Sequence, residues 1–401
     1  MPRTGASSVR NLSFQGYLRD DGAVGVRNHL LILPTCVCSA QCAMDIAART
    51  ASAGAVSFYH QHGCAQLEFD RVQTLRTLAG TGANPNVAAV LVVGLGCENV
   101  TANEIVAAIA AQSSKPVAAI TIQDEGGTER TIERGSELVH SLAAVSRIDR
   151  ATRQSIGLDH VVLALECGGS DALSGLTANP VAGWVADRVV AAGGTVILSE
   201  TTELIGAEHL LAARAPNPAV ATALMDTVAR VEASIKATGV DLRGSQPAPG
   251  NIRGGLTTIE EKSLGCIHKG GTSPLQEVLA YGVRPRCKGL TFMDTPGHDV
   301  ESMTGMIAGG AHAVLFTTGR GTPTGAPVAP VIKIATNDRL WSLMRPNLDF
   351  SAGGIAAGRQ TVAAAGELLL QLLLDVLSGQ LTRSEQLGNR EFGIYRIGPT
   401  V

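Results

Sequence analysis

Short apolar runs alternate with polar stretches of helical periodicity along the first 150 residues. Four runs rich in aliphatic residues predict strands, each leading through a loop into a helical segment; they lie at 28–35, 55–66, 88–99 and 115–124. The third run is almost continuously aliphatic, which is typical of a parallel strand covered on both faces. Strands that alternate with helices predict an α/β fold with a mostly parallel sheet.

The same alternation continues through the second half of the chain. Strand–loop units are predicted at 162–180, 195–201, 289–299, 312–325 and 329–337. A short charged connection near residues 147–157 indicates a domain boundary. We therefore expect a flexible tail at 1–14, an N-terminal α/β domain at 15–150 and a C-terminal α/β domain at 151–401. Both domains are expected to be Rossmann-like, with the site at the carboxyl ends of strands and between the domains, because α/β proteins bind ligands beyond those strand ends.

Composition narrows the class of protein. The 401 residues are enough for two or three cores, and 45% hydrophobic with 17% charged residues excludes global disorder. A net charge of −3 without a long basic run argues against a nucleic-acid partner, as does the aromatic content of 3%. The first residues lack the apolar core of a signal peptide, and the longest apolar stretch, near 366–379, is too short for a membrane span. We expect a cytoplasmic protein whose eight cysteines stay reduced.

Glycine-bearing polar loops follow several predicted strands, and four of them carry a cysteine. These cysteines are Cys64, Cys97, Cys167 and Cys266. None pairs with another at zinc-finger spacing, so a metal site would be assembled in space from distant loops. Three thiolates could hold an iron–sulfur cluster, and a mixture of cysteine, histidine and carboxylate could hold a single Fe²⁺. The alternative is that these are small buried residues packed near tight turns.

Other polar residues at the strand ends suit acid–base chemistry and anion binding. His60 and His62 would point to one side of an extended segment. Glu98 and Glu166 each adjoin a cysteine and could be metal ligands, bases or helix caps. The loop at 317–325, TTGRGTPTG, has glycines that expose backbone N–H groups and an arginine that could bind a carboxylate. No glycine pattern completes a dinucleotide fingerprint, so no nicotinamide or nucleotide cofactor is expected.

These loops resemble those of the altronate/galactarate dehydratase family. The matching segments run in order from about residue 16 to the C-terminus; they are GVRN (25–28), LPT (33–35), the GC of HGCAQ (63–64), VGLGCEN (93–99), LECGGSDALSGLTANP (165–180), KSLGC (262–266), FTTGRGTP (316–323), VIKIATN (331–337) and LDFSAG (348–353). The resemblance implies an iron-dependent bacterial hydro-lyase. Such an enzyme would convert an altronate- or galactarate-like 2,3-dihydroxy acid into a 2-keto-3-deoxy acid.

The chain differs from the family pattern at its N-terminal end. Family members have a small β-rich N-terminal domain, whereas this chain starts where their large part starts. The larger subunit of (2R)-sulfolactate sulfo-lyase is similar in this respect, so the resemblance implies a separate small β-rich subunit and an oligomer. Release of sulfite and pyruvate from sulfolactate is therefore the alternative reaction. A non-catalytic acid-binding subunit or a zinc-stabilised one is the alternative from another class.

The resemblance and the loop chemistry together assign candidate roles. The general acid or base is expected among His60, Glu98, Glu166 and Lys269, and iron is expected on some three of Cys64, Cys97, Cys167 and Cys266. The residues expected to bind the hydroxy-acid substrate are Ser170, Asp171, Asn179, Thr318, Arg320 and Lys333. Cys36, Cys42 and Cys287 are interpreted as packing residues, the role of Cys38 stays open, and His268 matches no motif of the family.

Overall fold

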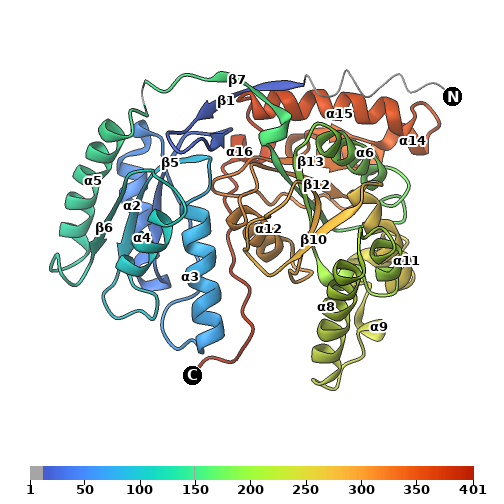
Figure 1. The fold of residues 1–401 in the computed structure, drawn as a ribbon, viewed down its shortest axis with the longest axis horizontal. Helices are drawn as coiled ribbons and strands as arrows, with labels where there is room; N and C mark the ends of the chain where they lie inside the picture. The colour runs from blue at the N-terminus through green and yellow to red at the C-terminus, as the bar shows by residue number, and fades with distance from the viewer. Residues whose placement is uncertain (1–11, 149) are drawn as a thin grey trace.

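A computed structural model gives the fold and describes residues 12–148 and 150–401 (Figure 1). The N-terminal part contains a parallel sheet in the order β4-β3-β5-β6. Its elements are β3 (His29–Pro34), α2 (Val37–Arg49), η1 (Ala51–Ala53), β4 (Ala55–Ser57), α3 (Glu68–Gly82), β5 (Val87–Gly94), α4 (Ala102–Ala110), β6 (Val117–Thr121) and α5 (Thr128–Val145). Because side chains alternate along each strand, α2 and α5 pack on one face and α3 and α4 on the other.

The C-terminal part contains a larger parallel sheet in the order β10-β11-β9-β8-β12-β13-β14. Its strands are β8 (Val162–Gly168), β9 (Thr195–Leu198), β10 (Leu275–Leu279), β11 (Gly289–Met293), β12 (Ala313–Thr318), β13 (Val331–Ala335) and β14 (Phe350–Ser351). The α/β class with mostly parallel sheets is therefore confirmed. The strand that opens the polar 162–180 loop, β8, lies at the centre of this sheet.

Helices cover both faces of the larger sheet. The longer ones are α6 (Ala178–Ala191), α8 (Pro218–Lys236), α11 (Ile259–Cys266), α12 (Asp299–Ala308) and α15 (Val362–Leu377); the shorter are η2 (Leu158–His160), η3 (Thr201–Glu203), α7 (Glu208–Ala212), α9 (Leu242–Ser245), α10 (Pro249–Arg253), η4 (Ile267–Gly270), α13 (Asp338–Leu343), η5 (Arg345–Asn347), α14 (Gly353–Ala356) and α16 (Arg383–Leu387). Leu163 and Leu165 of β8 pack with α6 and α15, whereas Ala164 between them packs with α12. Among the described residues, no helix is both long and apolar enough to cross a bilayer.

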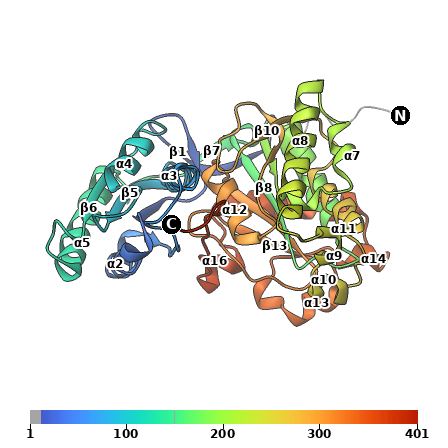
Figure 2. The same cartoon turned by 90° about the horizontal axis from the view of Figure 1, so that it is seen from below.

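A small antiparallel sheet joins the two parts. In it β1 (Ser13–Leu18) pairs with β2 (Val24–Gly25) on one side and with β7 (Gln154–Gly157) on the other (Figure 2). The segment 16–28 is thus partly a hairpin, and Gly22 supplies the positive φ of +81° in its turn. Most of the tail predicted at 1–14 lies outside the described residues, and Ser13 and Phe14 already belong to β1.

Two local predictions were wrong. The strand expected at 55–66 ends at Ser57, because the next residues make side-chain contacts rather than sheet pairs: Phe58 stacks on Phe392 at 3.9 Å between ring centroids. The stretch 244–257, GSQPAPGNIRGGLT, predicts a loop by its glycines and prolines, yet it contains the end of α9 and all of α10. Asp241 caps α9 by accepting the Arg243 N–H at 3.0 Å, and Pro249 stands in the first turn of α10, where its fixed φ suits a helix.

Buried polar side chains hold the two parts together. Asn86, at the start of β5, donates from Nδ2 to the carbonyls of His312 and Val328 at 2.9 and 3.0 Å. The ring of His312 accepts the Val162 N–H at 2.9 Å and donates from Nε2 to the Val24 carbonyl at 2.8 Å. These bonds connect the hairpin, the N-terminal sheet and the C-terminal sheet through side chains that are almost fully buried. The two parts therefore form a bonded interface.

This interface predicts an acid sensitivity. Burial, opposed by the bonds to Val24 and Val162, lowers the pKa of His312 from 6.5 to about 4, so the folded protein keeps the ring neutral. Below pH 6.5 the unfolded chain takes up the proton first, and stability should fall until about pH 4, by up to about 3 kcal/mol for this residue. His312→Gln, which keeps a donor and an acceptor, should be less stable than wild type near pH 8 and approach it near pH 4. Urea denaturation across this range measures the difference, and a gap that stays constant with pH would contradict the prediction.

Candidate functional site

The centre of the site is the carboxyl end of β8. Strand alternation turns Cys167 toward the α6 face of the sheet, as for Leu163 and Leu165, and turns Glu166 toward the α12 face. At the last residue of the strand, a Cβ on Gly168 would overlap the carboxylate of Asp299, so a glycine there leaves room for the start of α12. The strand therefore delivers a thiol and a carboxyl group to opposite sides of one sheet edge.

The neighbouring strand β9 brings a second pair of acids to the same edge. Glu200 follows it with φ +67° and ψ 76°, a left-handed conformation that is uncommon for a residue with a side chain. Its N–H donates to Thr295 Oγ1 at 2.8 Å, and that bond helps to hold the turn. Glu203 comes from the following helical turn, η3. Strain of this kind concentrates at functional sites, where the surrounding structure maintains it.

A buried lysine joins these groups. Lys269 Nζ lies 2.8 Å from Cys167 Sγ, 3.1 Å from Glu200 Oε2 and 3.3 Å from Glu203 Oε2, and its side chain is 1% exposed. A second lysine, Lys262, lies 3.1 Å from Glu203 Oε1. The lysines come from η4 and α11, which follow each other in the chain. Two cations thus compensate the charge of the acids inside the protein.

Burial and neighbouring charges give the three glutamates different protonation. Burial and then the charge of Glu203 raise the pKa of Glu200 to about 7. Burial and then Glu200 raise the pKa of Glu166 well above its ordinary value, which favours the protonated carboxyl. Burial alone would raise the pKa of Glu203, but Lys262 and Lys269 hold it well below its usual range. Burial opposes the charge of Lys269, yet the surrounding thiols and carboxylates raise its pKa, so it stays an ammonium.

A row of side chains extends this site across the α12 face. Glu166, Phe316 and Lys333 occupy the same register position on β8, β12 and β13. Lys333 Nζ lies 3.2 Å from the centroid of the Phe316 ring and has no hydrogen-bond partner within the described chain, and the same holds for Glu166 Oε2. Burial lowers the pKa of Lys333 to about 7 against the opposing charges of Asp299 and Glu166. Two buried groups at this edge are therefore available to a ligand.

A cavity of about 240 Å³ opens onto the cluster, somewhat below the roughly 300–1,000 Å³ that is usual for ligand pockets. It is lined by Cys167, Gly168, Gly169, Ser170, Glu200, Glu203, Gln246, Ala248, Gly250, Asn251, Lys262, Gly297 and Asp299. Asn251 donates from Nδ2 to the Ser170 carbonyl at 2.9 Å and so fastens α10 over the loop after β8. A larger hollow of about 840 Å³ lies around Arg19 and Lys115, away from these residues. The smaller cavity is the candidate substrate site because the reactive groups line it.

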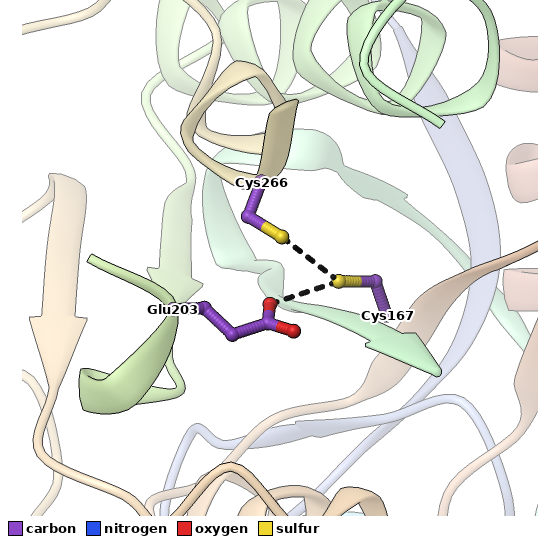
Figure 3. Close-up of side chains that lie close together, drawn as sticks. All are labelled: Cys167, Glu203 and Cys266. Atoms are coloured by element: carbon purple, nitrogen blue, oxygen red, sulfur yellow. Dashed lines mark hydrogen bonds between the residues drawn. The ribbon is translucent and has the colours of Figure 1, made fainter. Parts of the chain in front are cut away.

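Three side chains at the cluster form a donor set for a metal. Cys167, Glu203 and Cys266 point toward one another from β8, η3 and α11, with their ligand atoms within 4.8 Å (Figure 3). The Cys167 and Cys266 sulfur atoms are 3.6 Å apart. Two thiols and a carboxylate suit iron better than Mg²⁺ or Ca²⁺, which prefer oxygen ligands. The hydrogen bond to Cys266 and burial raise the pKa of Cys167, so metal binding would displace its proton.

A second group of potential ligands consists only of acids. Glu166, Glu200 and Asp299 bring carboxylate oxygens within 4.8 Å of one another. A cluster of the aconitase type would need three thiolates. Among the residues that the structure describes, only Cys167 and Cys266 are thiols of the Lys269 cluster. The donor set therefore fits a single iron ion.

Most of the predicted substrate-binding residues lie around this edge, several with structural bonds. Ser170 Oγ lies 3.6 Å from Cys167 Sγ and lines the cavity. Asp171 accepts bonds from Thr336 and Asn337 at 2.8 and 3.1 Å. Asn179 accepts a bond from Thr317 Oγ1 at 2.6 Å and donates to the Gly265 carbonyl at 2.9 Å.

The 317–325 loop follows β12 beside the cavity. Thr318 Oγ1 accepts the N–H groups of Gly321 and Thr322 at 2.8 and 3.1 Å, so this hydroxyl shapes the loop. Arg320 is exposed, and its Cβ lies against the loop after β8 at Gly169. Substrate binding by this loop stays a prediction.

The remaining predicted residues lie in the N-terminal part. Cys64 and Cys97 are exposed there and do not join the Lys269 cluster. Both ring nitrogens of His60 are bonded: Nδ1 accepts the His62 N–H at 3.3 Å, and Nε2 donates to the Pro34 carbonyl at 3.0 Å. Glu98 accepts bonds from Thr35 Oγ1 at 2.8 Å and from the Gly96 N–H at 2.6 Å. The structure thus divides the predicted site between two sheets.

The sequence interpretation missed Glu200, Glu203, Asp299 and Lys262 as site residues. Glu200, Glu203 and Asp299 lie in or next to loops at the carboxyl ends of parallel strands. Lys262 lies four residues before the predicted ligand Cys266. The signal that could have found Glu200 and Glu203 is the position of SETTE directly after the aliphatic run TVIL.

Fold and site define an α/β enzyme with a buried cluster of acids, lysines and thiols at the carboxyl edge of a parallel sheet. The chain belongs to the D-galactarate/altronate dehydratase family. The family model of the "D-galactarate/Altronate dehydratase, C-terminal" region matches residues 158–400, and that of the "D-galactarate dehydratase/Altronate hydrolase, second domain" matches residues 16–146. The resemblance seen in the sequence is therefore confirmed.

Relatives of two activities are similar over nearly the whole chain. An altronate dehydratase of Escherichia coli (strain K12) is 37% identical over 398 residues, which are 96% of this chain and 78% of the relative. An altronate dehydratase of Bacillus subtilis (strain 168) is 35% identical over 98% of this chain and 80% of the relative. The (2R)-sulfolactate sulfo-lyase subunit beta of Chromohalobacter salexigens is 37% identical over 97% of this chain and 98% of that subunit.

Proposed function

We propose that this chain is an iron-dependent hydro-lyase that removes water from a sugar acid related to altronate or galactarate. The observation that carries the proposal is the buried Lys269 ammonium, which is bonded to Cys167, Glu200 and Glu203, three residues that line a cavity. Relatives with dehydratase names support it. A separate small subunit is proposed as partner, in line with the name "subunit beta" of one relative.

The groups of the cluster suit the removal of a proton next to a carboxylate. That C2 proton is weakly acidic, and Glu200, with a pKa of about 7, can accept it near neutral pH. The electrons then form an enediolate, which the Lys269 ammonium stabilises in a site shielded from water. Glu166, whose raised pKa favours the protonated form, can donate a proton as the C3–O bond breaks, so that hydroxide leaves as water. The resulting enol rearranges to the 2-keto-3-deoxy acid.

Cys167, Glu203 and Cys266 are the residues that would hold iron. When bound, iron supplies a Lewis acid for a charged oxygen of the reacting molecule. The protein groups keep separate roles, because Glu200 and Glu166 do not belong to this donor set. Lys333 and Ser170, near the cavity, are proposed to bind the substrate carboxylate and hydroxyls.

Sulfite release from (2R)-sulfolactate is the second candidate, because the sulfo-lyase subunit is as similar to this chain as the dehydratases are. Both reactions begin with the same proton removal and differ in the leaving group. The chain should therefore be purified anaerobically, supplied with Fe²⁺ and tested with altronate, galactarate and (2R)-sulfolactate.

The products distinguish the candidates. Formation of a 2-keto acid from a sugar acid, without sulfite, supports the proposal. Sulfite from sulfolactate supports the second candidate instead. If none of the three acids reacts, even with a candidate small subunit added, the lyase assignment is overturned.

A further inference from the structure

Three loops meet at the carboxyl edge of the N-terminal sheet, and they carry four cysteines. Cys36 precedes α2 in the loop after β3 and Cys38 lies in the first turn of α2; the segment after β4 holds Cys64, and the loop after β5 holds Cys97. Strands β3 and β5 are neighbours in the sheet, paired up to Pro34 and Val93. The fold thus brings Cys36 and Cys97, which are 61 residues apart in the sequence, to the same edge of one sheet.

Hydrogen bonds tie these loops to one another. The Val37 N–H donates to the His62 carbonyl at 2.6 Å, which connects the start of α2 to the segment after β4. Thr35 Oγ1 donates to Glu98 Oε1 at 2.8 Å, which connects the loops after β3 and β5. A Cβ on Gly63 would lie 3.3 Å from Cys36 Cβ, so the residue before Cys64 lies directly against Cys36.

The loop that carries Cys64 is held firmly. The ring of His62 donates from Nε2 to the Ile394 carbonyl at 2.8 Å and accepts a bond from Gln66 Nε2 at 2.8 Å. Both ring nitrogens of His60 are bonded, one to the carbonyl of Pro34 at the end of β3 and one to the N–H of His62 in its own segment. Both histidines are almost fully buried. Their rings lie in the interior and hold the cysteine loop through hydrogen bonds. The conformation of this loop therefore does not depend on a bound ligand.

The thiols on these segments differ in their exposure to solvent. Partial burial, followed by the charges of Cys36, Cys64 and Cys97, raises the pKa of the Cys38 thiol. Cys36 is 1% exposed, whereas Cys38, Cys64 and Cys97 are all exposed to solvent. Three accessible thiols are therefore carried by adjoining segments at one edge of the sheet, next to the buried Cys36. Neighbouring thiolates repel one another, and a bound cation removes that repulsion.

We propose that Cys38, Cys64 and Cys97 form a second metal site, in the N-terminal part, for a metal that prefers thiolate ligands: a single iron or zinc ion or a small iron–sulfur cluster. Cys38 lies in the first turn of the 13-residue helix α2, where backbone N–H groups favour a thiolate. Each thiol loses its proton to solvent when the metal binds. The site is separate from the Cys167–Glu203–Cys266 group and stands whether or not that group binds iron.

The test is a titration of the reduced, metal-free protein with Co²⁺ alone, which gives charge-transfer absorption when thiolates bind it. Cys97→Ser and Cys64→Ser should each weaken Co²⁺ binding at one site by at least about tenfold. Even the loss of a residue that only hydrogen-bonds to a metal ligand has an effect of that size. Cys167→Ser should keep binding at that site. Cys287→Ser, which removes an exposed thiol elsewhere, is the matched control and should match wild type.

Alkylation read by peptide mass spectrometry gives a second measurement that does not depend on activity. Co²⁺ should protect Cys38, Cys64 and Cys97 together, and leave the rate at Cys287 unchanged. The proposal is overturned if all four thiols react equally fast with and without the metal, or if Cys167→Ser alone removes all thiolate absorption. Acid-labile sulfide in the anaerobically purified protein would identify a cluster at this site, provided that Cys97→Ser removes it.

Discussion

Replacement of Lys269 by methionine should abolish turnover and lower the free energy of unfolding by about 3–5 kcal/mol, the range observed when one partner of a buried ion pair is removed. The ammonium is 1% exposed and is bonded to a thiol and two carboxylates. Methionine fills a similar volume but leaves Glu200 and Glu203 with only Lys262 as a nearby cation. Turnover should vanish because the enediolate loses its stabilising charge. Urea denaturation and a keto-acid assay measure the two effects.

Lys236→Met provides the control for this experiment. Lys236 Nζ lies 3.1 Å from Glu232 Oε1 on the surface of α8, with the lysine side chain 58% exposed. Exposed pairs of this kind contribute at most about 1 kcal/mol. If Lys269→Met unfolds no more easily than Lys236→Met, the Lys269 cluster is not the buried charge network that the distances indicate. If it loses stability but turns over normally, the electrostatic role of Lys269 is wrong.

Glu200→Gln should lower kcat by about 10²–10⁴-fold while the protein remains folded, which is the usual contribution of a positioned general base. The amide keeps the shape of the side chain, and its oxygen can still accept a hydrogen bond from Lys269. It cannot accept the C2 proton. KM should change little, because Glu200 is proposed to act on the proton rather than to bind the acid. Initial-rate kinetics on the substrate identified by the product assay give both constants.

Glu367→Gln is the matched substitution for comparison, since Glu367 is an exposed residue of α15. It should leave kcat unchanged. A Glu200→Gln protein with the kcat of wild type would remove Glu200 from the mechanism. In that case Glu166 and Asp299, the other two acids of the carboxylate group, become the residues to test.

Much of the fold could be predicted from the pattern of apolar residues alone. The aliphatic runs around Val90 and Leu163 are buried parallel strands, because a strand covered by helices on both faces must be apolar at every position. The segment after β4 could not be predicted in this way. Its apolar and polar residues look like a strand, yet they contact Phe392 and Ile394, which are more than 300 residues away in the chain.

The candidate site shows the same division. The loop of Glu166 and Cys167 stood out in the sequence because polar and ionisable residues follow an apolar strand, and the structure brings Cys266 and Lys269 to it. Cysteines share a site only when their loops follow strands of the same sheet. Cys64 and Cys97 occupy loops of the same type, but they belong to the other sheet.

Local sequence therefore determined which segments are strands, which loops are polar, and that those loops lie at the carboxyl ends of parallel strands. Only the tertiary structure decided that β9 lies beside β8, which places Glu200 and Glu203 against Cys167. The physical reason is that chain periodicity depends on neighbouring residues and reports burial, whereas the order of strands in a sheet depends on packing between distant segments. Lys269 stays charged in the interior because that packing surrounds it with anions, and its position in the sequence does not show this.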